Sequence, residues 1–242
     1  MPNVIEIQNL VVGYDKKNIL DDLSLTVRRG EIFGFLGLNG AGKSTTIKAI
    51  LGLIHPVSGQ VLLHGLPPSD VRSRIRVGFL PEEATYYRFL TPLEILNFMG
   101  ELFGIPKSIL KKRIPDLLEL VGLTEVRNKL LGTFSKGMAQ KLGLAQALVN
   151  EPETLILDEP TSGLDPLARM DLRKILKDLK KRGRTIFFSS HELSEAELLC
   201  DSIAIIHSGR LIKSGSLQDV LGGAREENLE LFFLETIRKA DS

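Results

Sequence analysis

A glycine-rich stretch near the start of the chain has the residue types and spacing of a phosphate-binding loop. Residues 37–45 read GLNGAGKST, which matches the pattern G-x-x-x-x-G-K-[S/T] between an apolar run and a helical pattern. Glycines permit the backbone angles and close approach that let successive N–H groups face a polyphosphate. Lys43 is then expected to reach the β- and γ-phosphates, Ser44 to ligate Mg²⁺, and Thr45 to contact an α-phosphate oxygen. The predicted nucleotide-binding residues of this loop are Gly37, Asn39, Gly40, Ala41, Gly42, Lys43, Ser44 and Thr45.

The second chemical feature is an apolar run that ends in two acids. Residues 154–159 read TLILDE, and an acid at such a strand end holds Mg²⁺ in P-loop enzymes. We therefore predict that Asp158 holds Mg²⁺ through its water shell, and that Glu159 orients and deprotonates an attacking water. Without the glycine-rich loop, the pair could equally be two solvated acids at the end of a strand. The loop favours the catalytic interpretation.

A third polar stretch, TFSKGMAQK at 133–141, contains neither an acid nor a histidine. Ser135 is expected to cap a helix over 136–149, with Gly137 just inside it. A serine hydroxyl, bare backbone N–H groups and the positive end of a helix dipole together suit a γ-phosphate. Because the chain already has one phosphate loop for each nucleotide, this helix end suggests a phosphate shared between two copies of the protein. The alternative is an ordinary helix cap.

These groups are expected to be positioned by alternating strands and helices. The pattern predicts an α/β fold: a P-loop NTPase core with a parallel sheet, an N-terminal antiparallel β subdomain and a helical insert. We expect one domain, with its core at 1–83 and 151–221, the insert at about 84–150 and a short C-terminal helix within 224–242. Thr91-Pro92-Leu93-Glu94 predicts a helix start with a capping box. Predicted strands cover 4–12, 23–27, 31–37, 59–63, 77–80, 154–158, 185–189, 203–207 and 210–213, with a turn at 13–18.

Composition narrows the functional classes. The chain has 242 residues, 43% of them hydrophobic and 25% charged, with a formal net charge of +1. This balance gives no electrostatic reason to expect nucleic-acid binding. The single cysteine, Cys200, excludes an internal disulfide framework and fits a reducing compartment. We expect neither a signal peptide at the N-terminus nor a membrane-spanning helix, because no apolar run is long enough.

The motifs resemble those of the nucleotide-binding subunits of ABC (ATP-binding cassette) transporters. The signature of that family is Leu-Ser-Gly-Gly-Gln, followed two residues later by Gln and Arg; here the serine and the second glycine are kept. The stretch precedes the acidic strand by one helix, as in the family, and residues 160–165 (PTSGLD) resemble its D-loop. The matching signature residues are Ser135, Lys136, Gly137 and Met138, and those of the D-loop are Ser162, Gly163, Leu164 and Asp165.

The resemblance assigns further roles. His191, at a strand end, is similar to the family's switch histidine, and Tyr14 to the aromatic residue that stacks on adenine. The resemblance implies that two copies pair head to tail around ATP and Mg²⁺. Glu159 would then activate water, while His191 and Lys43 stabilise charge on the transferring phosphoryl group. It also implies a transmembrane permease partner, which would hold this chain at the cytoplasmic face of the membrane, and a second ATPase subunit that is this chain or a related one.

Two departures from the family pattern point to one branch. Glu82 occupies the position of a family glutamine that reaches Mg²⁺, so a carboxylate is expected to take that role. Together with Lys136, it is similar to an exporter-like group that handles drugs, antibiotics, lipids or polysaccharides. The region 83–103 is the expected dock for the membrane partner, with ordinary core packing as the alternative. The aromatic residues expected to take part are Tyr86, Tyr87, Phe89 and Phe98.

Other P-loop classes fit less well. The runner-up is a soluble ABC ATPase of DNA repair or translation, but the chain has one cassette, no sustained heptads and no cysteine cluster. A GTPase would need Asn-Lys-x-Asp, and residues 128–131 read NKLL. A non-catalytic ATP-binding regulator would not need both Glu159 and His191.

Overall fold

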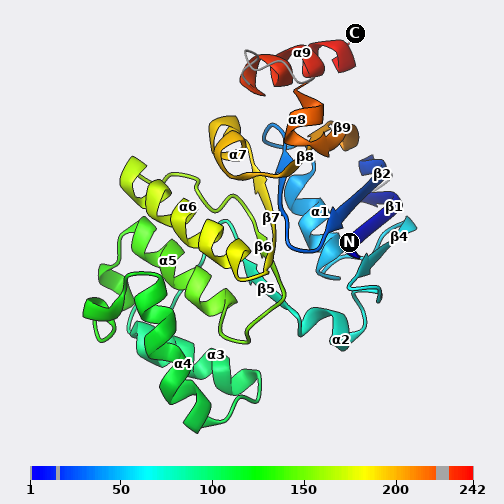
Figure 1. Ribbon diagram of the computed structural model, residues 1–242. Coiled ribbons are helices and arrows are strands. Elements are labelled where there is room, and N and C mark those ends of the chain that lie inside the picture. The colour runs from blue at the N-terminus through cyan, green and yellow to red at the C-terminus, as the bar shows by residue number, and fades with distance from the viewer. Residues whose placement is uncertain (1, 15–16, 222–228, 242) are drawn as a thin grey trace.

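The structure is a computed structural model that describes residues 2–14, 17–221 and 229–241. Two sheets organise it, with strand orders β2-β1-β4 and β5-β6-β7-β3-β8-β9 (Figure 1). The strands are β1 (Asn3–Tyr14), β2 (Lys17–Arg28), β3 (Ile32–Leu36), β4 (Ser58–Leu63), β5 (Val77–Leu80), β6 (Thr154–Leu157), β7 (Thr185–Ser190), β8 (Ser202–His207) and β9 (Arg210–Ser216). The helices are α1 (Lys43–Ile50), α2 (Val71–Arg74), α3 (Pro92–Leu102), α4 (Lys107–Leu120), α5 (Lys136–Ala147), α6 (Pro166–Lys181), α7 (Leu193–Leu199), α8 (Leu217–Val220) and α9 (Leu229–Asp241), with 3₁₀ turns at Thr124–Val126 and Leu131–Thr133.

The larger sheet is parallel except for its edge strand β9, which confirms the predicted α/β architecture. All residues of β3, β6 and β7 are buried, as expected for parallel strands covered on both faces. Because β6, β7 and β3 are neighbours, their carboxyl ends meet at one edge of the sheet. The loops that follow these three strands carry Glu159, His191 and the glycine-rich sequence.

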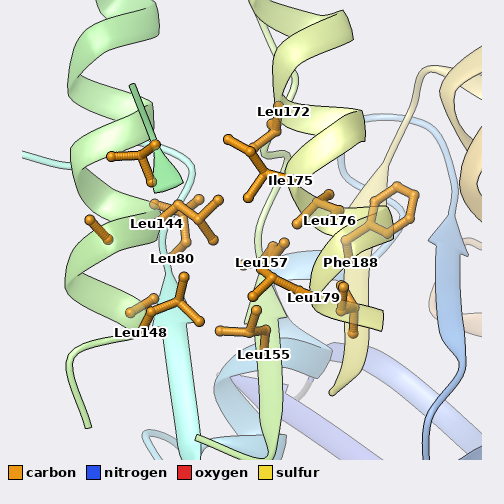
Figure 2. Packing of buried hydrophobic residues seen from close by; sticks show 14 of the residues in the cluster. Leu80, Leu144, Leu148, Leu155, Leu157, Leu172, Ile175, Leu176, Leu179 and Phe188 are labelled. Carbon is orange, nitrogen blue, oxygen red and sulfur yellow. The ribbon is translucent and has the colours of Figure 1, made fainter. Parts of the chain in front are cut away.

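Alternate residues of each central strand point to opposite faces, so two apolar clusters form. Leu155 and Leu157 of β6 face the first cluster, whereas Ile156 between them faces the second. Helices α5 and α6 cover the first face, and Figure 2 shows their leucines meeting those of β5 and β6. The second face is closed by α1 and the small antiparallel sheet, which contributes Ile5, Leu23 and other buried residues.

Strand pairing in the small sheet extends further than predicted. β1 pairs antiparallel with both β2 and β4. Gly13 pairs with Asn18 and Tyr14 with Lys17, so the expected turn at 13–18 is wrong at both ends. The residues between Tyr14 and Lys17 belong to the part of the chain that the structure does not describe.

Both predicted helix starts are confirmed. Thr91 and Glu94 form the complete capping box of α3, and Ser135 caps α5 by accepting from the Met138 N–H at 3.2 Å. Asp165, which was predicted only as a D-loop residue, also caps α6. Helix α7 was not expected; its first residues have no side-chain cap, and it is held by the burial of Ala196 and Leu199.

Helices α3, α4 and α5 gather on one side of the larger sheet, away from the small sheet (Figure 1). Near the C-terminus, α9 packs on α7, β8 and β9, and its buried residues are Leu229, Phe233 and Ile237. Within residues 2–14, 17–221 and 229–241, every helix falls short of the length and hydrophobicity needed to cross a bilayer.

Candidate nucleotide-binding site

The loop between β3 and α1 adopts a conformation that requires its glycines. Gly42 has φ 111°, and a Cβ there would lie 2.6 Å from Leu20 Cδ2. A Cβ on Gly37 would lie 2.6 Å from the Ile206 carbonyl oxygen. A side chain at either position would therefore displace its neighbours. The expectation that these glycines provide unusual angles and close approach is confirmed.

A distant hairpin supports this loop from outside. β8 and β9 are joined by Ser208 and Gly209, both with positive φ (47° and 78°), as in a two-residue type I′ turn. The Gly209 N–H donates to the Ala41 carbonyl at 3.0 Å, and the Gly209 carbonyl accepts from the Asp21 N–H at 2.9 Å. We call this turn the 208–209 hairpin turn. It joins the glycine-rich loop to β2.

Lys43 is buried at the first turn of α1, with 6% of its surface exposed. Its Nζ donates to the Gly37 carbonyl at 2.7 Å and lies 3.1 Å from Glu159 Oε1. A buried ammonium group is stable only when paired in this way. The ammonium therefore lies between the glycine-rich loop and the acid that follows β6.

Glu159 links Lys43 to His191. Its Oε2 lies 2.8 Å from His191 Nδ1 and accepts from the His191 backbone N–H at 3.4 Å. Glu159 is 5% exposed and has φ 47°, a left-handed backbone that is costly for a residue other than glycine. Such strain occurs at functional sites, where the surrounding structure holds the residue in place. The three residues predicted to be catalytic, Lys43, Glu159 and His191, are thus brought into one row.

Asp158 and Glu159 share one serine. The Ser189 hydroxyl donates to Asp158 Oδ1 at 2.6 Å and accepts from the Glu159 N–H at 2.9 Å. Ser189 is fully buried at the end of β7. Ser189 belongs to no motif that the sequence shows. It reaches Asp158 and Glu159 only because β7 pairs with β6.

These elements enclose a cavity of about 450 Å³. Residues of the glycine-rich loop form one part of its wall, and the acids Glu82 and Glu159 form another. Its lining residues are Ile19, Asn39, Gly40, Gly42, Lys43, Ser44, Thr45, Glu82 and Glu159. Among the described residues, no group of three or more His, Cys, Asp or Glu side chains could hold a metal alone. The oxygen donors Ser44, Glu82 and Asp158 suit Mg²⁺, which proteins hold with few carboxylates plus waters and substrate phosphates.

The predicted signature residues lie apart from this cavity, since Ser135, Lys136, Gly137 and Met138 are absent from its lining. Instead, the Lys136 side chain lies against Gly163 in the predicted D-loop of its own chain. It is so close that a Cβ on Gly163 would lie 2.6 Å from Lys136 Nζ. Of the other predicted D-loop residues, Ser162 donates its backbone N–H to the Glu159 carbonyl, Leu164 is buried and Asp165 caps α6. Tyr14 ends β1, but its side chain lies outside the described part of the molecule.

The aromatic residues after β5 divide into two groups. Tyr86 lines a groove of about 300 Å³ between β5, α3 and α5, and burial raises the pKa of its phenol. The rings of Tyr87 and Phe89 are tilted against each other with their centroids 5.6 Å apart; they are 68% and 70% exposed, and Phe98 is also exposed. Tyr86 therefore packs against the core and lines the groove together with Tyr87, whereas Phe89 and Phe98 lie exposed outside its lining.

Ser189→Ala is expected to lower the free energy of unfolding by about 1–3 kcal/mol, because it leaves a buried carboxylate and a buried N–H without their shared partner. It should also lower ATP turnover by displacing Asp158 and Glu159. Ser73→Ala is the matched control: Ser73 is equally buried and hydrogen-bonded, but lies in α2 outside the cavity. Chemical denaturation and an ATPase assay on both variants test this. Equal turnover in the two variants would contradict the expectation.

Comparison with known proteins agrees with this geometry. The model of the ABC transporter family matches residues 20–162. The chain is 51% identical to an ABC transporter ATP-binding protein of Nostoc sp. (strain PCC 7120) over 84% of this chain and 61% of that protein. It is 44% identical to the bacitracin transport ATP-binding protein BcrA of Bacillus licheniformis, over 88% of this chain and 70% of that protein.

A solved structure described as the ATP-binding subunit of an ABC transporter has the same fold. It superposes with a TM-score of 0.88 at 36% identity and covers 97% of this chain and 99% of that one. Two curated relatives are about 50% identical to this chain, and the chain spans about three-fifths of their length.

Proposed function

Because the chain belongs to the ABC transporter family, we propose that it is an ATP-binding and ATP-hydrolysing subunit that drives a substrate across a membrane. One observation carries the proposal: Lys43, Glu159 and His191 stand in a row, and the first two line a cavity walled by the glycine-rich loop. A phosphate-binding cation, a carboxylate and a histidine at one strand edge provide what phosphoryl transfer to water requires.

The Lys43–Glu159 pair indicates how the site responds to nucleotide. Phosphate oxygens on the loop would replace Glu159 as the partner of Lys43, while the N–H groups at the start of α1 hold the phosphates. Glu159 would then be free to accept a proton from a water aligned with the γ-phosphate. His191, bonded to the other oxygen of Glu159, fixes the direction of that carboxylate.

Ser44, Asp158 and Glu82 would hold Mg²⁺, and Tyr14 would stack on the adenine. When bound, Mg²⁺ neutralises charge on the phosphate groups. The Ser189 hydroxyl donates a hydrogen bond to Asp158 Oδ1, and among the described residues no hydrogen bond is made to Asp158 Oδ2. This arrangement leaves an acceptor for the water shell of the metal.

Glu82→Gln is expected to raise the Mg²⁺ concentration needed for half-maximal ATP hydrolysis by about fivefold, because an amide is a weaker ligand than a carboxylate for this hard cation. Its neighbour Glu83 provides the matched control, since it lies outside the nucleotide cavity. The measurement is a Mg²⁺ titration of the initial rate at saturating ATP. An unchanged midpoint for Glu82→Gln would exclude this residue from the metal site.

Two copies would pair head to tail, so that Ser135, Lys136, Gly137 and Met138 of one face the phosphates held by the other. The support is geometric: the capped start of α5 offers N–H groups and a positive dipole end, yet lies outside the cavity of its own chain. ATP would join the pair and its hydrolysis would release it. The second copy can be this chain or a related ATPase subunit.

A mixing experiment tests this arrangement. Lys43→Ala disables the phosphate loop, and Ser135→Arg blocks the start of α5; each purified variant alone should be inactive. A one-to-one mixture should recover about one quarter of the wild-type activity, because half of the pairs are mixed and each keeps one intact site. No recovery, with both variants folded and able to pair, would contradict the shared site.

The proposed contact with a membrane partner is supported by the groove lined by Tyr86 and Tyr87 and by the exposed aromatic residues Phe89 and Phe98 in the same region of the chain. We propose that a transmembrane permease docks there and holds the chain at the cytoplasmic face. Residues 84–150 would move with it as a helical lobe on the core formed by 1–83 and 151–221. Similarity to a bacitracin transport protein supports an exporter of drugs, antibiotics, lipids or polysaccharides, and disfavours a DNA-repair or translation ATPase.

A further inference from the structure

Two ion pairs join α6 to the segment that follows His191. Arg169 Nη1 lies 2.5 Å from Glu192 Oε2, and Arg173 Nε lies 3.5 Å from Glu195 Oε2, one helical turn further on. Only the first pair also reaches the D-loop, because Arg169 Nε donates to the Leu164 carbonyl at 2.9 Å. One guanidinium therefore holds a D-loop carbonyl and the carboxylate next to His191.

The contact continues to the phosphate loop. The Glu192 N–H donates to the Ser190 hydroxyl at 2.9 Å, and the Ser190 carbonyl accepts from the Gly37 N–H at 3.2 Å. His191 lies between these two residues and contacts Glu159. A connected set of hydrogen bonds thus runs from the D-loop, past the histidine, to the first glycine of the nucleotide site.

We propose that Arg169 is a positioning residue that couples the D-loop to the histidine loop of the same chain. The inference rests on the proposed function. Lys136, on the proposed pairing surface, lies against Gly163 of the D-loop, so pairing would shift the D-loop. Arg169 transmits that shift to Glu192 and so sets His191 against Glu159. Chemistry then proceeds only in a closed pair. The planar guanidinium suits this task, because it offers two directed donors where a lysine offers a single point charge.

Arg173→Ala is the matched control for Arg169→Ala, since both break an ion pair between the same two segments and only one touches the D-loop. We expect Arg169→Ala to lower kcat for ATP hydrolysis by about 10- to 100-fold, as a misplaced catalytic group does. Its KM, its ATP Kd and its melting temperature should match those of the control. Arg169→Lys should recover little of the lost kcat. The measurements are steady-state ATPase kinetics, equilibrium ATP binding and thermal denaturation of the full chain.

Glu192→Ala removes the same contact from the other side and gives a second route if Arg169→Ala does not fold. Combined with Arg169→Ala, it should lower kcat no further than the slower single variant. Equal kcat values for Arg169→Ala and Arg173→Ala, or additive losses in the double variant, would overturn the inference while the proposed function stands. Failure of the proposed function is distinct: the wild-type chain would then hydrolyse no ATP.

Discussion

Replacing Glu159 with glutamine is expected to lower kcat by about 100- to 1,000-fold while leaving ATP binding intact. The amide keeps the size of the carboxylate and can still contact Lys43 and His191, but it cannot take a proton from water. The ATP-bound pair should therefore accumulate. Size-exclusion chromatography with ATP, together with a single-turnover assay, measures both effects.

Glu195→Gln is the matched control for this substitution. Glu195 is as buried as Glu159, each being 5% exposed, and also lies beside a cation, Arg173. It is outside the cavity, so turnover should stay near the wild-type value and no stable pair should form. If Glu159→Gln hydrolysed ATP at the wild-type rate, Glu159 would not be the base.

Lys43→Ala is expected to weaken ATP binding by roughly 10- to 150-fold, which corresponds to about 1.5–3 kcal/mol for a charge-assisted hydrogen bond. It should also destabilise the nucleotide-free protein by about 1–3 kcal/mol, because Glu159 loses its buried cation and keeps only His191. Isothermal titration with ATP and chemical denaturation without ATP measure the two effects separately.

The double variant Lys43→Met/Glu159→Gln distinguishes these two roles. Removing both charges should restore most of the lost stability, since neither is then buried without a partner, yet ATP turnover should stay abolished. Lys48→Ala, in the same helix but exposed, should change neither property. A double variant no more stable than Lys43→Ala would contradict the expectation that this variant loses stability because Glu159 is left buried without its cation.

Local sequence was sufficient for the parts of the site whose residues are neighbours along the chain. The glycine-rich loop, the strand before Asp158 and the Ser135 cap each depend on a short pattern. The structure has a loop, a strand and a cap there, and the strand ends at Leu157, one residue earlier than predicted. The roles predicted for their residues stay predictions until the variants are made.

Contacts between segments could not be predicted in the same way. Ser189 and Arg169 act through residues on other elements, and their partners follow from the placement of β7 between β6 and β3 and of α6 against the start of α7. The strand pairing beyond Gly13 and the helix at Leu193–Leu199 were missed for a related reason. Both are stabilised by packing against distant segments rather than by capping or turn residues of their own.

The 208–209 hairpin turn has a consequence for synthesis of the chain. The phosphate loop is made early, yet Ala41 receives its hydrogen bond from Gly209, and β3 lies between β7 and β8. A nascent chain that ends before residue 202 would contain the whole motif GLNGAGKST without the strand and turn that hold it. Such long-range pairing forms late. We therefore expect the chain to become competent to bind nucleotide only when most of the polypeptide has left the ribosome.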